Sequence, residues 1–259
     1  MNSIPYLYIS NSHCQGPNWS AELEASAGLP TIPHIMEALD PSIFEFEKLA
    51  ILFADDLLHP LRIELEEKAA GKELNQYLLW KLKRFLPWPV DQVTMRHLPL
   101  EDPKTFMTFS LPKTWLTDLF DAMSAQGVHC GYMGGLFLTL LENKPAFRNQ
   151  LTVALFNDFY MLSRLNGKGD FLDFRTRRLP FKTSGQLDAA TLVQGDLAPM
   201  RDENGKILLL NFSSNLDQER GDLLQLLEGS GMQPHMPELP GAGVLARFES
   251  CMNSKAGLP

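Results

Sequence analysis

Histidine and cysteine are the side chains of this chain that could ligate a metal ion or act as nucleophiles. The six histidines are His13, His34, His59, His97, His129 and His235, and the three cysteines are Cys14, Cys130 and Cys251. A structural zinc site needs several ligands that converge with short local spacing. The closest pattern here is two adjacent pairs, His13–Cys14 and His129–Cys130. Adjacent residues on a strand point to opposite faces, so we predict no metal site.

Carboxylates and glycine-rich turns give no catalytic pattern either. The acid pairs Asp55–Asp56 and Glu66–Glu67 follow predicted strands, where charged residues usually solvate loops. No Gly-x-Ser-x-Gly elbow and no phosphate-binding loop ending in Lys-Ser/Thr occurs. The glycine-rich stretch Asn166–Gly169 lies between two predicted strands, so it is read as a hairpin turn. We therefore predict no enzymatic activity, no catalytic residue and no bound cofactor.

Composition and charge narrow the classes of partner and compartment. The chain has 259 residues, is 44% apolar and carries a net charge of −8. An acidic surface repels nucleic acid, and the densest basic stretches, Lys81–Arg84 and Arg175–Arg178, are short enough to be solvated faces. Few, odd and widely spaced cysteines indicate a reducing compartment. With no signal peptide and no apolar run near the roughly 20 residues that span a bilayer, we expect a cytoplasmic protein.

Strands and helices alternate along most of the sequence, which indicates an α/β fold. Residues 11–40 are polar and rich in Pro, Gly and Ser, and are read as loop with one short helix. Predicted strands cover residues 6–9, 49–54, 61–65, 93–98, 105–109, 128–131, 151–156, 159–165, 171–175, 207–212 and 232–236. Predicted helices cover residues 72–86, 112–127, 135–142, 186–200, 217–228 and 243–250.

The predicted helix of residues 72–86 carries a side chain that needs an explanation. Its apolar stripe is formed by Leu74, Tyr77, Leu78, Leu82 and Phe85. Trp80 falls off that stripe, beside Arg84, and Trp88 follows in the Pro87–Pro89 turn. One reading is that a neighbouring element of the same chain covers Trp80. The other is that Trp80, Arg84 and Trp88 receive a partner peptide or a second copy, since aromatic and arginine side chains often anchor interfaces.

The stretch from residue 49 to 129 resembles a known family. It reads strand, strand, helix, then Phe85-Leu86-Pro87-Trp88-Pro89-Val90-Asp91-Gln92-Val93, strand, strand and a helix closed by Gly127. This order, and the aromatic Pro-x-Pro turn followed by an acid and a strand, are similar to the pilus-assembly protein PilM and the cytoplasmic part of the secretion protein GspL. The resemblance implies an actin-like fold, a duplicated ribonuclease H-like α/β architecture with an inserted strand-helix-strand subdomain. The implied segments are residues 1–67, the insertion at 68–130, and 131–259.

Nucleotide-binding members of the actin-like group hold their ligand with three glycine-rich loops. The resemblance implies that the first two follow the opening strand of each half and that the third follows a late strand. The corresponding stretches here are Ile9–Cys14, Phe156–Tyr160 and Asn211–Asn215, and none contains glycine. Backbone amides approach a phosphate closely only where no side chain intervenes. We therefore expect the scaffold role of the family and not its ATPase role.

The resemblance implies a non-catalytic scaffold of a type IV pilus or type II secretion assembly platform. Its partner would be an inner-membrane assembly protein of PilN or GspL/GspM type, bound through a short cytoplasmic peptide, with a homodimer as a further arrangement. The partner would hold the chain at the inner membrane. The alternatives are an actin-like ATP-binding protein or kinase and an adaptor unrelated to pili. The sequence leaves open whether the system is pilus or secretion and whether the chain belongs to a longer membrane protein.

Overall fold

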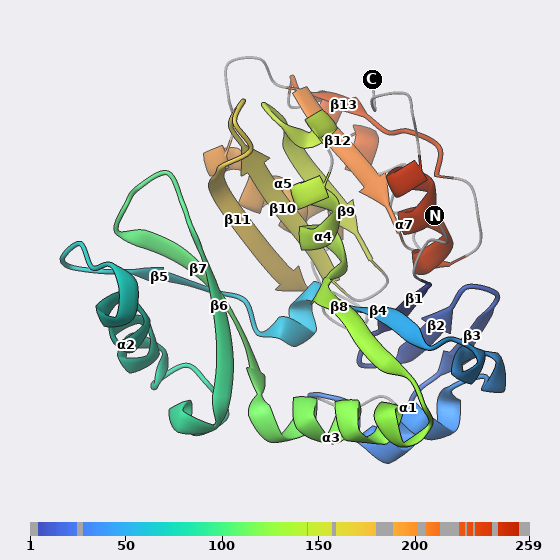
Figure 1. Ribbon diagram of the computed structural model, residues 1–259. Coiled ribbons are helices and arrows are strands. Elements are labelled where there is room, and N and C mark those ends of the chain that lie inside the picture. The colour runs from blue at the N-terminus through green and yellow to red at the C-terminus, as the bar shows by residue number, and fades with distance from the viewer. Residues whose placement is uncertain are drawn as a thin grey trace. The chain divides into compact units, whose positions relative to one another are not determined.

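A computed structural model describes most of the chain, and the chain divides into two compact units (Figure 1). The described residues are 5–24, 28–143, 145–156, 159–179, 189–200, 206–212, 223–225, 227–229, 231–239 and 243–253. The first unit is Met1–Thr139 and the second is Leu140–Pro259. Each unit is built around its own five-stranded sheet.

The sheet of the first unit combines a hairpin meander with two parallel strands. Its order is β3-β2-β1-β4-β8. Strands β1, β2 and β3 pair antiparallel, whereas β1 with β4 and β4 with β8 pair parallel. The central strand β4 is buried along nearly its whole length, as its continuous apolar sequence predicted. The strands are β1 (Tyr6–Ile9), β2 (His13–Gly16), β3 (Trp19–Glu22), β4 (Lys48–Phe53) and β8 (His129–Gly135).

The prediction that residues 11–40 form a loop with one short helix missed two strands. Strands β2 and β3 lie in this stretch, followed by helix α1 (Ile32–Ala38), which Thr31 caps. The side chains of β3 are half-buried or exposed. A short strand with one solvated side and few apolar residues has no clear alternation to detect.

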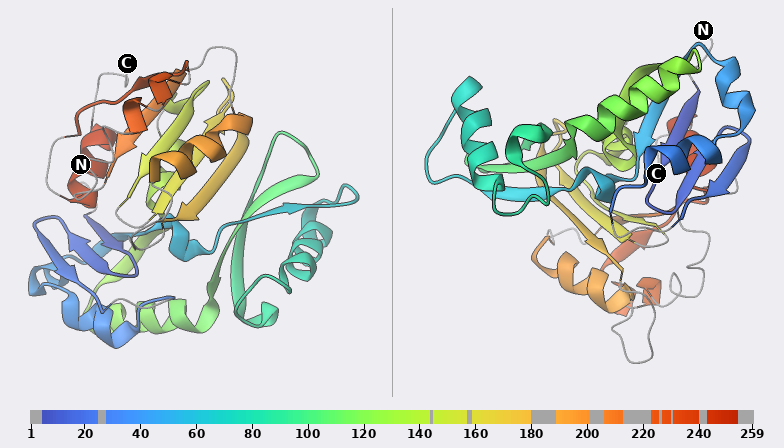
Figure 2. Two further views of the ribbon diagram at one scale, coloured as in Figure 1. Left: turned by 180° about the vertical axis from the view of Figure 1, so that it is seen from behind. Right: turned by 90° about the horizontal axis from the view of Figure 1, so that it is seen from below.

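A second, three-stranded sheet forms from the chain between β4 and β8. Its order is β5-β7-β6, all antiparallel, and helix α2 packs on one of its faces (Figures 1 and 2). The contact buries Leu74, Leu78 and Leu82 of α2 against Ile63 and Phe106. The elements are β5 (Leu61–Glu64), α2 (Gly71–Leu82), β6 (Val93–Pro99) and β7 (Thr105–Pro112). The insertion boundaries predicted at residues 68 and 130 stay a prediction.

Two helices connect this region to the rest of the chain. Helix α3 (Lys113–Ala125) follows β7 directly, and Gly127, with φ of 82°, closes it before β8. Helix α4 (Leu136–Asn143) begins immediately after β8 and carries the chain past the unit boundary at Thr139. Helix α2 ends at Leu82, earlier than the predicted Leu86, and continues as a turn in which the Leu86 amide donates to the Leu82 carbonyl.

The second unit repeats the strand order of the first. Its sheet runs β11-β10-β9-β12-β13, with β9, β10 and β11 antiparallel and β9, β12 and β13 parallel. This confirms the predicted meander of three strands. Strand for strand, the pairing directions match those of the first sheet, which is the duplication expected of an actin-like fold. The strands are β9 (Leu151–Leu155), β10 (Phe159–Leu165), β11 (Phe171–Arg178), β12 (Lys206–Asn211) and β13 (Gln233–His235).

Helices α5 (Ala189–Leu197) and α7 (Val244–Asn253) belong to the second unit. A polar network holds α5 to the sheet. The Tyr160 hydroxyl donates to Asp196 at 2.6 Å, and the Arg177 guanidinium donates to both oxygens of the same carboxylate at 2.8 Å. Most of the helix predicted at residues 217–228 lies outside the described residues.

The packing of α2 on the three-stranded sheet gives a direct stability prediction. Leu78 is fully buried in this contact, whereas Leu79 is only partly buried. We expect Leu78→Ala to lower the free energy of unfolding by about 2–5 kcal/mol, because it removes buried methyl groups and leaves a cavity. Leu79→Ala is the matched control and should cost less than half as much. Equal losses in chemical denaturation would contradict the contact.

Candidate functional site

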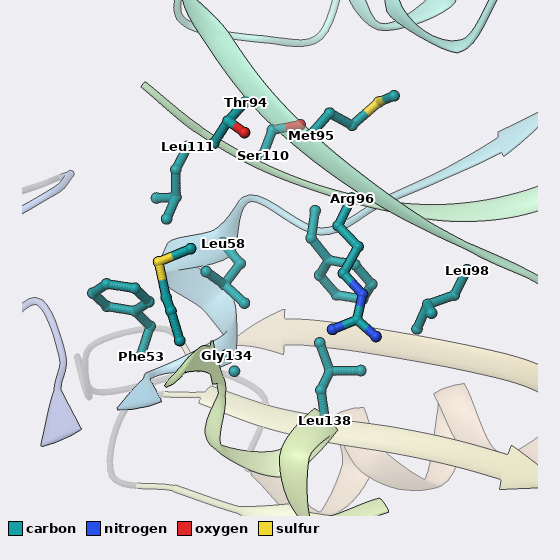
Figure 3. Close-up of a pocket in the computed structure, with 13 residues that line it drawn as sticks. Phe53, Leu58, Thr94, Met95, Arg96, Leu98, Ser110, Leu111, Gly134 and Leu138 are labelled. Atoms are coloured by element: carbon teal, nitrogen blue, oxygen red, sulfur yellow. The ribbon is translucent and has the colours of Figure 1, made fainter. Parts of the chain in front are cut away.

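A pocket of the first unit lies between the three-stranded sheet and the end of the five-stranded sheet (Figure 3). Most of its lining is apolar. The lining residues are Phe53 of β4; Leu58, between β4 and β5; Thr94, Met95, Arg96 and Leu98 of β6; Phe109, Ser110 and Leu111 of β7; Met133, Gly134 and Gly135 of β8; and Leu138 of α4. A concave apolar surface with one or two polar groups is the usual form of a binding site.

Strand alternation explains which side chains of β6 and β7 reach the pocket. Thr94 pairs with Leu111 and Arg96 pairs with Phe109, so these four share one face of the sheet. Met95 lies on the opposite face, where it packs with the α2 contact. In Figure 3 the Arg96 guanidinium extends toward Leu138, across the apolar lining. Arg96 is exposed and thus places a positive charge beside an apolar pocket.

Two strands that line the pocket are edge strands. β6 ends the order of the three-stranded sheet and β8 ends the order of the five-stranded sheet, among the strands that the structure describes. An edge strand presents backbone N–H and C=O groups that an incoming extended segment can pair with. Tyr132 and Met133 on β8 are also exposed, at 37% and 38%. The pocket therefore offers backbone pairing beside an apolar cavity.

Asp55 holds the start of α4, which contributes Leu138 to the pocket lining. Its carboxylate accepts hydrogen bonds from the Phe137 amide at 2.8 Å and from the Leu138 amide at 3.1 Å. These are the first amides of α4, which have no partner within the helix. Asp55 is fully buried, so its interpretation as a loop-solvating acid was wrong. The carboxylate is buried because it caps a helix that starts in the core.

The ionisation of Asp55 reflects two opposed effects. Burial raises the pKa of the carboxyl group, the hydrogen bonds from the Phe137 and Leu138 amides lower it by a smaller amount, and the neighbouring Asp56 carboxylate raises it. The net result is a pKa of about 7. The carboxyl group therefore changes charge near neutral pH, next to the pocket-lining residues Gly135 and Leu138.

Gly135 makes this capping geometry accessible. A Cβ atom at Gly135 would collide with the Asp55 carboxylate and with Leu58. At Gly134 it would meet Tyr132 and Thr139, whose hydroxyls bond each other at 2.9 Å. The two glycines at the end of β8 are thus required for close packing.

The residues predicted to bind a partner lie outside the pocket. Trp80 is 63% exposed on α2, and Arg84 is exposed in the turn that follows. Trp88 is half-buried, with its ring 5.6 Å from the ring of His59. Trp80 and Arg84 are therefore both exposed, whereas Trp88 makes an internal contact with His59. That Trp80, Arg84 and Trp88 contact a partner stays a prediction.

The first of the three loop positions is closed by a side chain. The Ser10 hydroxyl accepts hydrogen bonds from the amides of Ser12 at 3.3 Å and His13 at 2.9 Å. It also donates to the His13 carbonyl at 3.2 Å. Amides that would have to face a phosphate in a glycine-rich loop are therefore already bonded within the turn.

Aromatic rings gather where β9 and β12 end and β10 begins in the second unit. Phe156 follows β9, Phe159 begins β10 and Phe212 follows β12. Their rings are stacked, with centroids 4.2 Å apart for Phe156 and Phe159 and 5.1 Å apart for Phe156 and Phe212. All three are buried. These described residues flank the second and third loop positions, whose centres lie outside the described residues.

Two further features are absent from the described part of the chain. No group of three or more His, Cys, Asp and Glu side chains there is arranged to hold a metal ion. None of the helices described is both long and apolar enough to cross a membrane.

Solved structures share the fold at low sequence identity. No family model and no curated protein matches the sequence. The cytoplasmic domain of EpsL, an inner membrane component of the type II secretion system of Vibrio cholerae, is 13% identical, with a TM-score of 0.54 over 98% of this chain and 97% of that one. A Bacteroides thetaiotaomicron protein with an actin-like ATPase fold is 10% identical, with a TM-score of 0.60 over 97% and 96%.

The PilM-PilN type IV pilus biogenesis complex is similar as well. It is 15% identical and has a TM-score of 0.60, covering 95% of this chain and 89% of that one. These similarities confirm the predicted actin-like α/β fold and the resemblance to PilM and GspL in architecture.

The raised pKa of Asp55 predicts how stability depends on pH. The folded pKa of about 7 exceeds the ordinary value of 3.8, so the folded protein binds the extra proton between these values. The contribution of Asp55 to stability is thus complete below about pH 4 and is lost as the pH rises to about 7. We expect the free energy of unfolding of the unaltered protein, minus that of Asp55→Asn, to fall by up to about 1.4 kcal/mol per pH unit over this range. A difference that does not change with pH would contradict it.

Proposed function

We propose that this chain is a non-catalytic scaffold of a type IV pilus or type II secretion assembly platform, and that its pocket binds a cytoplasmic segment of a membrane partner. The observation that carries the proposal is the apolar pocket between edge strands β6 and β8. The fold supports it, because proteins with this architecture include EpsL, an inner membrane secretion component, and the PilM-PilN pilus biogenesis complex.

The chemistry of the pocket favours an extended peptide as the ligand. An extended peptide would add along the edge of β6 or β8, where backbone hydrogen bonds give affinity and side-chain pockets give specificity. Alternate side chains of such a peptide would enter the space bounded by Phe53, Leu58 and Leu138. The Arg96 guanidinium would meet a carboxylate or a backbone carbonyl. The expected ligand is therefore a short segment with alternating apolar residues and an acidic group.

The first loop position and the described residues that flank the other two support a scaffold over an actin-like ATPase or kinase. The Ser10 hydroxyl bonds two amides of the first turn, and buried rings of Phe156 and Phe212 stack beside the other two positions. Holding a nucleotide there would require both arrangements to open. In the scaffold role, the chain works on the cytoplasmic side of the inner membrane because its partner is anchored there.

The pocket can be tested by pull-down with cytoplasmic segments of the membrane proteins encoded beside this chain's gene. We expect one of them to be retained by the unaltered protein. Met133→Glu should reduce retention at least about tenfold, because the bound segment would bury the new charge against apolar side chains without a partner. Arg96→Glu should also weaken it if the segment is acidic.

Phe46→Glu is the control for Met133→Glu, because Phe46 has a similar exposure of 37% and does not line the pocket. It should leave retention unchanged, and all variants should keep their melting temperature within a few degrees of the parent. Equal retention by Met133→Glu and Phe46→Glu would remove the pocket from the interaction. Neighbouring genes unrelated to pili or secretion would favour a different adaptor role.

Nucleotide binding is tested by calorimetry with Mg-ATP. We expect no saturable heat up to millimolar nucleotide, because the amides of the first turn already have a hydrogen-bond partner in Ser10. Affinity tighter than about 0.1 mM, or roughly 5 kcal/mol, is readily visible in this experiment. A saturable signal would favour the actin-like ATP-binding alternative.

A further inference from the structure

An exposed surface of the first unit combines aromatic and basic side chains at the end of α2. We call Trp80, Lys83, Arg84 and Phe85 the aromatic–basic surface. Trp80 is 63% exposed and Phe85 58% exposed, the two most exposed of the large hydrophobic side chains in the described residues. Exposure of two large aromatics within six residues is costly in water unless something covers them.

Hydrogen bonding and ion pairing distinguish this basic stretch from the other one. In the second stretch, Arg175 and Arg177 are paired with Asp173 and Asp196. By contrast, Lys83 and Arg84 make no side-chain ion pair or hydrogen bond with any residue that the structure describes. In a chain with a net charge of −8, two adjacent unpaired cations beside exposed aromatics indicate an anionic ligand.

Neighbouring side chains of α2 pack around Trp80. The Lys81 ammonium lies 5.8 Å from the ring centroids of both Tyr77 and Trp80 and pairs with Glu66 at 2.9 Å. The Tyr77 and Trp80 rings are 5.9 Å apart. Lys81 is therefore used to hold Trp80 in place, which leaves Lys83 and Arg84 for a ligand. Glu73 is the acidic residue of α2 and lies at its other end.

We propose that the aromatic–basic surface contacts the anionic headgroups of a lipid bilayer. Tryptophan and phenylalanine beside lysine and arginine are the side chains that settle at a membrane–water interface. Trp80 is on α2, and Lys83, Arg84 and Phe85 are in the turn that follows. All four side chains are exposed, and none lines the described pocket. A fluid lipid surface requires no matching cleft, whereas a protein partner held by two exposed rings usually has pockets for them.

This inference rests on the proposed function only in expecting a membrane nearby. The pocket and the aromatic–basic surface use different residues, so their ligands are separable. A peptide held in the pocket and a lipid surface held by α2 would bind the same unit at two points. Each contact would then raise the effective concentration of the other.

Binding to vesicles tests the proposal with the full chain. We expect co-sedimentation with vesicles of phosphatidylcholine containing about 30% phosphatidylglycerol and not with phosphatidylcholine alone. Binding should decline as salt rises from about 0.1 M to about 0.5 M, because the cations are exposed. Lys83→Glu combined with Arg84→Glu should weaken binding at least about tenfold. Vesicle binding should shift the tryptophan fluorescence of the parent to the blue. Trp80→Ala should weaken vesicle binding and remove most of that shift.

Matched controls test whether the loss of vesicle binding depends on this location or follows from any similar change in charge or hydrophobicity. Arg148→Glu combined with Lys168→Glu makes the same charge change at exposed sites of the second unit, and Phe46→Ala removes an exposed aromatic elsewhere in the first. Both should bind like the parent, and all variants should melt as the parent does. Absence of binding at about 1 mM lipid, or equal losses in variants and controls, would overturn the proposal. Loss of a partner segment in pull-down by Trp80→Ala, with vesicle binding unchanged, would assign the surface to a protein instead.

Discussion

The contact between the Asp55 carboxylate and the first amides of α4 determines the geometry of the first unit around its pocket. It joins a residue just after β4 to the start of α4. The end of β8 lies beside both, because β8 pairs with β4 and leads directly into α4. The carboxylate fits because Gly135 has no side chain. A buried carboxyl group near its pKa is a costly way to cap a helix. The bonds hold the start of α4, whose Leu138 lines the pocket.

Polar groups in this chain divide into those already bonded internally and those that still face outward. The Ser10 hydroxyl bonds its own turn, and Asp196 is bonded by both Tyr160 and Arg177. These groups stabilise the fold and offer little to a ligand. Among the groups that face outward are the backbone edges of β6 and β8 and the aromatic–basic surface. This division favours the proposed binding of a protein segment and a lipid surface over binding of a nucleotide.

Local patterns in the sequence predicted the fold where burial was strong. The apolar run at Leu49–Ala54 became β4, and the three-strand meander of the second unit formed as expected. The hairpin β2–β3 was missed because its side chains are half solvated. The duplicated strand order left no visible sequence repeat, since equivalent strands need only be apolar. The pocket and the capping role of Asp55 depend on residues about 80 positions apart, which local periodicity does not report.

Trp80 shows how a local irregularity and a tertiary observation complement each other. The helical pattern alone marked Trp80 as lying off the apolar stripe, which left internal packing and an interface as alternatives. Its 63% exposure disfavours full internal cover. The pairing of Lys81 with Glu66, and the lack of a described ion pair for Lys83 and Arg84, then add a charge preference that the pattern could not supply. An exposed ring beside unpaired cations is best accounted for by an anionic, partly apolar boundary, which is the chemistry of a lipid headgroup layer.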